Sequence, residues 1–230
     1  MTTVYIISAP SGSGKSTLVN GVREIVPGLD FSISFTTRPP RRNEKHEREY
    51  SFVPREEFEE MIREDDFLEY ANVFGNLYGT SRKFLREAER SGHDLLLDID
   101  VQGADQIKHK IPDAVRIFIL PPDRQTLEDR LRNRSLDAED VIQRRLATAT
   151  REIENYANYD YILVNDRLEE SVGTLKAILL AERLQRSAIK PTTDQIGLLA
   201  KAESCRLNNV RERLQPILAS FLPATAPGGR

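Results

Sequence analysis

The most diagnostic stretch of the chain is Val4-Tyr5-Ile6-Ile7-Ser8-Ala9-Pro10-Ser11-Gly12-Ser13-Gly14-Lys15-Ser16. Its first five residues are largely apolar and predict a buried strand, and residues 15–26 predict a helix that ends at Pro27-Gly28. Between them, small residues allow backbone N–H groups to converge on an anion where the helix begins. The stretch therefore predicts a strand–loop–helix unit that binds phosphate.

The loop follows the pattern GxxxxGK[ST] except at its first position, where Ala9 replaces glycine. A tight turn still fits Ala9 as long as its φ is negative. Lys15 supplies a positive charge for a phosphate, and Ser16 supplies a hydroxyl for Mg²⁺. A loop without a ligand is the alternative. The residues expected to contact ATP are Ala9, Pro10, Ser11, Gly12, Ser13, Gly14, Lys15, Ser16 and Thr17.

Composition excludes several classes of protein. The 230 residues carry 33 basic and 36 acidic side chains, a net charge of -3, which argues against a general nucleic-acid binder. Cys205 is the single cysteine, so no internal disulfide forms and a reducing, cytoplasmic location is expected. Residues 1–3 lack the basic start of a secretion signal, and apolar runs such as 117–120 are too short to span a membrane. We expect neither secretion nor membrane insertion.

Strand and helix patterns alternate along the chain, which predicts an α/β fold with a mostly parallel central sheet and helices on both faces. The segment 33–81 differs, because its period-2 patterns predict small antiparallel strands inserted into that fold. The predicted strands are 4–8, 31–35, 50–53, 95–100, 115–120 and 161–164, with short elements over 67–81. The predicted helices are 15–26, 54–64, 82–91, 124–134, 138–156 and 168–187.

The inserted segment carries a cluster of polar residues suited to a nucleotide. Arg38 and Arg41 flank a stiff Pro-Pro pair and could hold one phosphate, with tyrosine hydroxyls completing the shell. Glu69 only accepts hydrogen bonds when ionised, which matches the N1–H and N2–H₂ donors of guanine. A charged surface loop over 41–48 is the alternative. The cluster comprises Ser34, Arg38, Arg41, Arg42, Tyr50, Glu69, Tyr78 and Thr80.

Two acidic residues, Asp98 and Asp100, close an apolar strand. At a period of two their side chains share one face, at the carboxyl end where ligands of parallel sheets bind. A carboxylate there could hold a water bound to Mg²⁺ or orient a cation. The alternative is that these residues only end the strand and cap the next element, with 101–103 as a turn.

Three arginines occur in the predicted helices 124–134 and 138–156. Arg130 and Arg134 are spaced i,i+4 and so lie on one helix face. On the next helix Arg144 points away from the apolar stripe, whereas Arg145 lies about 70° from the centre of the stripe and could border a ligand. These cations suit a phosphoryl-transfer site that closes over its substrates. A surface helix with ordinary ion pairs is the alternative.

Several segments occur in an order that resembles the guanylate kinase family of nucleoside monophosphate kinases, over about residues 4 to 187. They are SAPSGSGKSTL, SISFTTRPPRRNE, EREYSFV, FLEYANVFGNLYGTS, LLLDIDVQGADQIK, RLRNRS, VIQRRLATATREI and YDYILVND. The resemblance implies reversible phosphoryl transfer from ATP to GMP, giving ADP and GDP with Mg²⁺, in purine metabolism and GMP recycling. It also implies a three-layer P-loop kinase fold with a small α+β GMP-binding region and a helical lid.

The resemblance further implies roles for individual residues. The GMP phosphate would be held by Arg38, Arg41, Tyr50 and Tyr78, and guanine by Ser34, Glu69 and Thr80 with help from Asp100. Asp98 would serve the Mg²⁺ shell through water, next to GMP, while Ser16 would bind the metal. The lid cations would be Arg130, Arg134 and Arg145, with Arg145 also at GMP, and Asn165 and Asp166 would lie at the ATP base. The implied catalytic residues are Lys15, Arg41, Arg134 and Arg145.

The family pattern divides the chain into a kinase domain over 1–187 and an extension over 188–230. Within the domain, the core is expected at 1–32, 82–122 and 151–187, the GMP-binding region at 33–81 and the lid at 123–150. In the extension, apolar residues recur at helical spacing, interrupted by Pro216, before a tail whose composition predicts flexibility. The stripe could pack on the core or join two copies of the chain, and we favour self-association. The stripe comprises Ile196, Leu199, Leu207, Val210, Leu214, Ile217 and Phe221.

Two other functions stay open at this point. A phosphopeptide-binding scaffold module of similar fold would not turn over nucleotide. The residues that argue against it are Lys15, Ser16, Arg134 and Arg145. A kinase for another phosphorylated acceptor, such as a ribose bisphosphate or a pyrimidine monophosphate, would not need Glu69 with Ser34. ATP and GMP are therefore the expected partners, with dGMP left open as a second acceptor, and neither nucleic acid nor membrane is expected.

Overall fold

The computed structural model describes residues 2–41, 44–73, 75–134, 138–187 and 190–222. The expected flexible tail at 223–230 lies outside these residues. The chain forms two compact units. The first consists of Met1–Ser8 and Val19–Ile117, and the second of Ala9–Leu18 and Phe118–Arg230.

Three parallel strands form the core of the first unit: β1 (Val4–Ser8), β2 (Leu29–Phe31) and β7 (Asp94–Asp98). Their order is β2-β7-β1, with Val4 opposite Leu95 and Phe31 opposite Leu96. Every residue of β1 is buried, which explains why this strand is a continuous, largely apolar run. The next strand, β8 (Val115–Leu120), begins in this unit beside β1. The predicted parallel α/β fold is confirmed.

Three helices contribute to this unit: α1 (Lys15–Ile25), α3 (Arg82–Ser91) and α4 (Val101–Lys110). α3 packs against β7, and α4 packs against β1. α3 begins at Ser81, whose Oγ accepts a hydrogen bond from the backbone N–H of Lys83, and ends at Gly92 in the left-handed conformation. The bounds of α3 thus agree with the helix predicted at 82–91.

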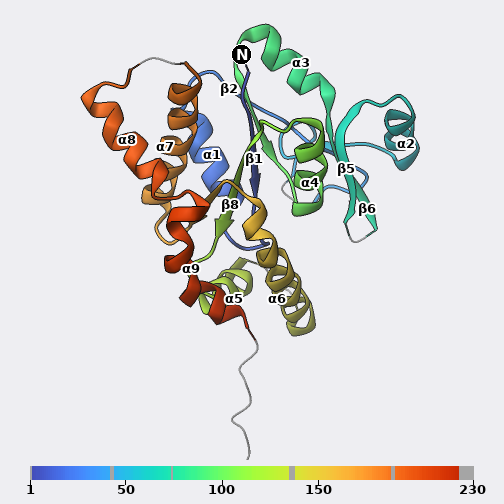
Figure 1. Cartoon of the computed structure of the whole chain (residues 1–230). Helices are drawn as coiled ribbons and strands as arrows, with labels where there is room; N and C mark the ends of the chain where they lie inside the picture. Colours follow the sequence, from blue (N-terminus) through green and yellow to red (C-terminus); the bar gives the residue numbers. More distant parts are fainter. Residues whose placement is uncertain (1, 42–43, 74, 135–137, 188–189, 223–230) are drawn as a thin grey trace, which may run out of the picture. The chain divides into compact units, whose positions relative to one another are not determined.

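The inserted segment forms a small second sheet in the order β4-β3-β6-β5. Its elements are β3 (Phe35–Thr36), β4 (Ser51–Phe52), α2 (Arg55–Arg63), β5 (Phe67–Val73) and β6 (Asn76–Ser81). β5 and β6 form an antiparallel hairpin with α2 beside it (Figure 1). Phe58 of α2 stacks on Phe67 of β5 at 4.5 Å between ring centroids, and both pack with Leu77 in a separate small core.

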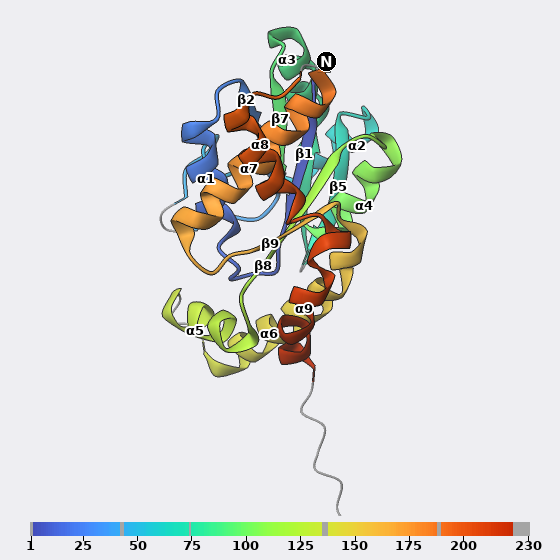
Figure 2. The ribbon, with the colours of Figure 1, turned by 60° about the vertical axis from the view of Figure 1, so that its left-hand side comes forward.

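The second unit combines the end of β8 with β9 (Tyr161–Val164), its neighbour in the sheet, and with helices. These helices are α5 (Arg124–Arg134), α6 (Glu139–Ile153), a 3₁₀ helix (Glu154–Asn158) and α7 (Leu168–Ser187). α5 packs against α6, and α7 packs against β9 (Figure 2). Buried residues of α6 follow the predicted apolar stripe: Ile142, Leu146, Ala149 and Ile153.

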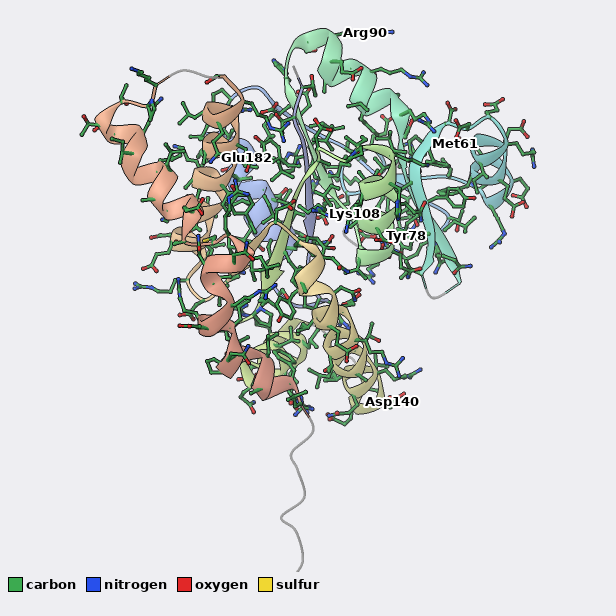
Figure 3. All side chains as sticks on the ribbon, in the orientation of Figure 1. Met61, Tyr78, Arg90, Lys108, Asp140 and Glu182 are labelled. Carbon is green, nitrogen blue, oxygen red and sulfur yellow. The ribbon has the colours of Figure 1, made fainter. Side chains whose placement is uncertain are left out.

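The C-terminal extension adds α8 (Thr193–Glu203) and α9 (Leu207–Phe221) to the second unit. α8 lies along α7, and α9 packs against α5 and β9 (Figure 2). Val210, Leu214 and Phe221 are buried within the chain, whereas Ile196 is 57% exposed. The buried carboxylate of Glu182 on α7 (labelled in Figure 3) accepts hydrogen bonds from the Tyr161 hydroxyl at 2.6 Å and from Arg206 Nη2 at 2.9 Å. Most of the apolar stripe of α9 is therefore covered by the chain itself.

Some local predictions are wrong. The single strand expected at 31–35 is divided, because β2 joins the parallel sheet and β3 joins the small one. β3 and β4 pair in parallel, not antiparallel. Pro216 lies inside α9 and does not interrupt it. Among the described residues, no helix has both the length and the apolar character that crossing a membrane requires.

Candidate active site

The phosphate-loop candidate in the second unit has the backbone that its sequence predicts. Gly12 and Gly14 adopt φ of +93° and +87°, a region that other residues rarely enter. Ala9 is not among the residues with positive φ, so its replacement of glycine requires no strain. The loop turns back through a hydrogen bond from Ser13 N–H to the carbonyl of Pro10, at 3.1 Å, and leads into α1. Lys15 and Ser16 are the first two residues of that helix.

Asn165 braces this loop from the end of β9. Its side-chain Nδ2 donates a hydrogen bond to the carbonyl of Ser13 at 2.7 Å, and the residue is 5% exposed. A Cβ on Gly14 would clash with the same Nδ2, so the loop and the amide are in close contact. The amide of Asn165 is therefore engaged by the loop, a role that the sequence did not reveal. Asp166, also expected at the ATP base, is exposed.

Helix α5 lies against the same loop. A Cβ on Gly12 would come within 2.9 Å of Leu127 and Leu131, so the lack of a side chain there permits the contact. Arg130 donates through Nη2 to the carbonyl of Asn165 at 2.9 Å, and its buried Nη1 has no hydrogen-bond partner among the described residues. The guanidinium is thus positioned beside the loop with donor capacity left. The helix includes the backbone of Arg134, but the side chain of this residue lies outside the described structure.

Arg145 of α6 reaches the loop as well. Its Nη2 lies 2.8 Å from Ser11 Oγ. The preceding residue, Arg144, is exposed and pairs with Asp140 on its own helix. The two arginines thus point in different directions, Arg145 to the loop and Arg144 to Asp140 on its own helix.

The first unit holds the residues expected to bind the acceptor nucleotide, and Arg38 is one of them. Its Nε donates to the hydroxyl of Tyr78 at 3.1 Å (Tyr78 is labelled in Figure 3), and its Nη2 lies 2.9 Å from both carboxylate oxygens of Glu44. The backbone N–H of Arg41 also donates to Glu44, at 2.7 Å. Glu44 thus holds the turn that carries both arginines. This role of Glu44 was not predicted from the sequence. The only sign of it was the position of Glu44 three residues after Arg41, and the many charged residues nearby obscured that sign.

Aromatic rings surround Arg38. The Tyr50 ring lies 5.8 Å from the Tyr78 ring, edge to face, and the guanidinium carbon of Arg38 lies 5.6 Å from the Tyr50 centroid. Ser34 is partly buried, whereas the side chain of Arg41 is exposed. The structure therefore brings Arg38, Tyr50 and Tyr78 together, with Arg41 three residues after Arg38 in the chain, while Arg42 lies outside the described residues.

Glu69 is a buried carboxylate, only 4% exposed. Thr80 faces it across the hairpin and donates its hydroxyl to Oε1 at 2.6 Å. Burial raises the pKa of Glu69 to about 7, and the negative charge of Asp100 acts in the same direction. The hydrogen bond from Thr80 and the charge of Lys110 oppose this rise in pKa only in part. The structure thus brings Glu69 and Thr80, two of the residues expected at guanine, into direct contact.

The two acidic residues after the apolar strand occupy different kinds of position. Asp98 is the last residue of β7 and is partly buried. Asp100 lies beyond the strand and caps α4, where its Oδ1 accepts from the backbone N–H of Gly103 at 2.8 Å. The strand predicted to reach residue 100 is therefore too long, and the predicted turn at 101–103 is the first turn of a helix. Asp100 therefore acts as the N-cap of α4, because an aspartate at this position satisfies a free helix N–H.

A family profile described as Guanylate kinase matches residues 1–182. The chain belongs to the guanylate kinase family. It is similar to the guanylate kinase of Koribacter versatilis (strain Ellin345), with 56% identity over 228 residues that cover 98% of each protein. The guanylate kinase of Escherichia coli (strain K12) is 49% identical over 196 residues, which cover 84% of this chain and 95% of that one.

A solved guanylate kinase structure, from Anaplasma phagocytophilum, agrees with the fold. It matches with a TM-score of 0.67 and 32% identity, covering 93% of this chain and 94% of that chain. The family resemblance inferred from the motifs is thus confirmed. The guanylate kinase profile ends at residue 182, within α7, so α8 and α9 lie outside the matched region.

Proposed function

We propose that this guanylate kinase family member transfers the γ-phosphoryl group of ATP to GMP, reversibly, giving ADP and GDP. The observation that carries this proposal is the buried Glu69–Thr80 pair, in the unit that also holds Arg38 with its tyrosine partners. Together they offer an acceptor for a base and cations for a phosphate. Family membership supports the same activity.

Guanine selection would rest on the Glu69 carboxylate. When ionised, it accepts hydrogen bonds from guanine N1–H and N2–H₂, which adenine does not present together. A buried acceptor left unpaired by the wrong base can reject that base by roughly 10⁴-fold. Thr80 fixes the orientation of the carboxylate, and Ser34 and Asp100 would complete the contacts with the base.

The acceptor phosphate would be held by Arg38, Arg41, Tyr50 and Tyr78. Arg38 and Tyr78 are already hydrogen-bonded, so these donors are partly preorganised. On the donor side, the backbone of residues 9–17, with Lys15 and Arg130, would bind the phosphates of ATP, and residues 165–166 would border its base. Arg134 and Arg145 would neutralise the charge on the transferring group.

The residues also fit Mg²⁺. This ion usually retains several waters and takes one or two protein groups together with substrate phosphates. Ser16 offers an exposed hydroxyl at the start of α1, and Asp98 offers a partly buried carboxylate at the end of β7. Within the described residues, no group of three or more His, Cys, Asp or Glu side chains forms a metal cage. When bound with ATP, the ion would reduce the negative charge of its phosphates.

The expected reaction is a direct in-line attack by a GMP phosphate oxygen on the γ-phosphorus, without a covalent enzyme intermediate. No general base is required, because the GMP phosphate is already largely ionised at neutral pH. The side chains of the protein would bind the two anions, lower their repulsion and exclude water. Lys15, Arg41, Arg134 and Arg145 are the proposed catalytic residues.

The remaining assignments belong to the same proposal. The kinase domain would comprise the core at 1–32, 82–122 and 151–187, the GMP-binding region at 33–81 and the lid at 123–150, followed by the extension at 188–230. The enzyme would act in the cytoplasm. Self-association would have to use surfaces other than the buried residues of α9, for example the one around exposed Ile196. A mass measurement of the full chain in solution tests that point.

A coupled assay of ADP release with the full chain, ATP and Mg²⁺ tests the activity. The acceptors are GMP, dGMP, AMP, CMP, UMP and a ribose bisphosphate. We expect GMP to be used far better than AMP or the pyrimidine nucleotides. Efficient use of another acceptor in place of GMP would contradict the guanine assignment, and no turnover with any acceptor would favour a phosphopeptide-binding module.

A further inference from the structure

The first turn of α4 lies directly against the Glu69 carboxylate, within the first unit. α4 packs against β5, as Figure 1 also shows. Gly103, in this first turn, is buried. A Cβ built on Gly103 would lie 2.5 Å from Glu69 Oε2, 2.9 Å from Cδ and 3.4 Å from Cγ. Ordinary van der Waals contacts of a carbon begin at about 3.5 Å, so only glycine fits here without a shift of the carboxyl group.

Glycine is required at position 103 because the Glu69 carboxyl group lies so close, and not because of the backbone conformation. Gly103 is not among the glycines with positive φ, and it sits inside a regular helix. Glycine is less favourable than alanine in a helix, by up to about 0.5–1 kcal/mol in the helix interior. A benefit other than backbone freedom therefore offsets the lost helix stability, and the close approach of Glu69 is the one that the structure shows.

The helix cannot simply move away from β5. Gln106 exchanges two hydrogen bonds with the backbone of Tyr70: Nε2 donates to its carbonyl at 2.7 Å, and Oε1 accepts from its N–H at 3.3 Å. Lys110 Nζ donates to the carbonyl of Leu68 at 2.7 Å. These contacts hold α4 on both sides of residue 69 along the strand. An added side chain at 103 would therefore displace the flexible carboxyl group and not the helix.

On the other side, Thr80 limits where the carboxyl group can go. Its hydroxyl holds Oε1 at 2.6 Å while Gly103 borders Oε2. The carboxyl group thus lies between a hydroxyl and a helix turn without a side chain. A shift away from residue 103 must strain or break the bond with Thr80.

We propose that Gly103 is a specificity-determining positioning residue, whose missing side chain sets the place of the Glu69 carboxylate that reads guanine. This inference rests on the proposed GMP kinase activity. Gln106 and Lys110 keep Gly103 next to Glu69, because they fix α4 on β5. The residue does not touch the substrate in this proposal; it acts through Glu69.

The test compares Gly103→Ala with Gly197→Ala in the full chain. Gly197 lies in α8, and a Cβ there meets nothing within 4 Å, so this variant controls for the same chemical change in a helix. For Gly103→Ala we expect the KM for GMP to rise on the order of tenfold or more, because displacements of about 1 Å cost up to about 10²-fold. The KM for ATP should stay near that of the parent, and the preference for GMP over AMP should fall. Gly197→Ala should leave all three values unchanged.

A double variant isolates the contact. Glu69→Asp withdraws the carboxyl group by one methylene, which leaves room for a methyl group at 103. Gly103→Ala should therefore raise the KM for GMP much less in the Glu69→Asp background than in the parent. Equal effects in both backgrounds would overturn the proposal. So would a Gly103→Ala enzyme that retains the GMP constants and base preference of the parent.

The outcomes also separate this inference from the proposed activity. If the parent phosphorylates GMP and Gly103→Ala does so equally well, only the inference fails. If the parent shows no GMP kinase activity, the proposed function fails and the inference fails with it. If Gly103→Ala loses affinity for both ATP and GMP and melts at a lower temperature, the role of Gly103 is merely structural. That result would also overturn the inference.

Discussion

Arg38 Nη2 lies 2.9 Å from both carboxylate oxygens of Glu44. Both side chains are mostly buried, with exposures of 13% and 16%, so solvent screens the pair only in part. Glu44 also accepts the backbone N–H of Arg41, which ties the turn to the same carboxylate. The acceptor cations are thus held by a residue that does not itself suit a phosphate.

Glu44→Gln should raise the KM for GMP by about tenfold, because a hydrogen bond to a charged group contributes about 1.5–3 kcal/mol. The KM for ATP should not change. Initial rates at varied GMP and at varied ATP measure the two constants. A lower KM for GMP would show instead that Glu44 competes with the phosphate for Arg38. Glu49→Gln serves as the control, because Glu49 likewise pairs with an arginine, the exposed Arg48, and accepts a backbone N–H, that of Lys45.

The affinity for GMP should depend on pH through Glu69. Its pKa is raised to about 7, chiefly by burial, so below that pH the protonated carboxyl group loses the acceptor that guanine requires. The KM for GMP should therefore fall as the pH rises from about 6 to about 8, across that pKa. GMP binding by the Glu69→Gln variant should be weak and should lack this dependence. An identical pH profile in parent and variant would refute the assignment.

The same group should make folding stability depend on pH. The folded pKa of Glu69 lies above the unfolded value of 4.5, so the folded protein binds more protons between these two values. The free energy of unfolding therefore decreases as pH rises from 4.5 towards about 7. Each tenfold difference in proton affinity corresponds to about 1.4 kcal/mol, which makes the effect a few kcal/mol at most.

Glu69→Gln mimics the protonated form and should remove that decrease. Urea unfolding of parent and variant at a pH of about 5 and at a pH of about 8 measures the difference directly. We expect the variant to be the more stable protein at the higher pH and similar to the parent at the lower one. A constant difference at both values would show that Glu69 does not carry the effect.

Asn165→Asp should weaken ATP binding more than Asn165→Ala does. The amide Nδ2 donates to the carbonyl of Ser13, whereas a carboxylate cannot donate and would repel that oxygen. Removal of one partner of a buried hydrogen bond costs about 1–3 kcal/mol, so the KM for ATP should rise about tenfold for alanine and further for aspartate. The KM for GMP is the internal control. Equal KM values for ATP in all three proteins would exclude a bracing role.

Arg145→Met should lower kcat by about 10²-fold or more, the usual cost of removing one donor that stabilises a transition state. Arg144→Met is a matched control, because the side chain of this exposed neighbour pairs only with Asp140 in the contacts of the described residues. Steady-state kcat for both variants measures the contrast. Turnover within a few fold of the parent for Arg145→Met would exclude its proposed catalytic role.

The sequence predicted local features well, that is, those that depend on residues a few positions apart. The helix start at Ser81 and its end at Gly92 result from local hydrogen bonds and backbone freedom. The positions of Arg144 and Arg145 result from helical periodicity alone. By contrast, one alternating pattern at 31–35 predicted a single strand, because alternation does not reveal which sheet a strand joins.

Local sequence predicted the strand–loop–helix unit at 4–26, most of the strands and helices, and the residue types proposed for both halves of the site. These depend on steric limits and periodicity, which act over a few residues. The partners of these residues emerge only in the folded chain: Glu44 beside Arg38, Asn165 bonded to Ser13, and Gly103 against Glu69. Such partners lie up to 152 positions apart in the chain. Their contacts arise only when whole elements pack, because packing brings distant backbone segments within the range of a hydrogen bond or a methyl group.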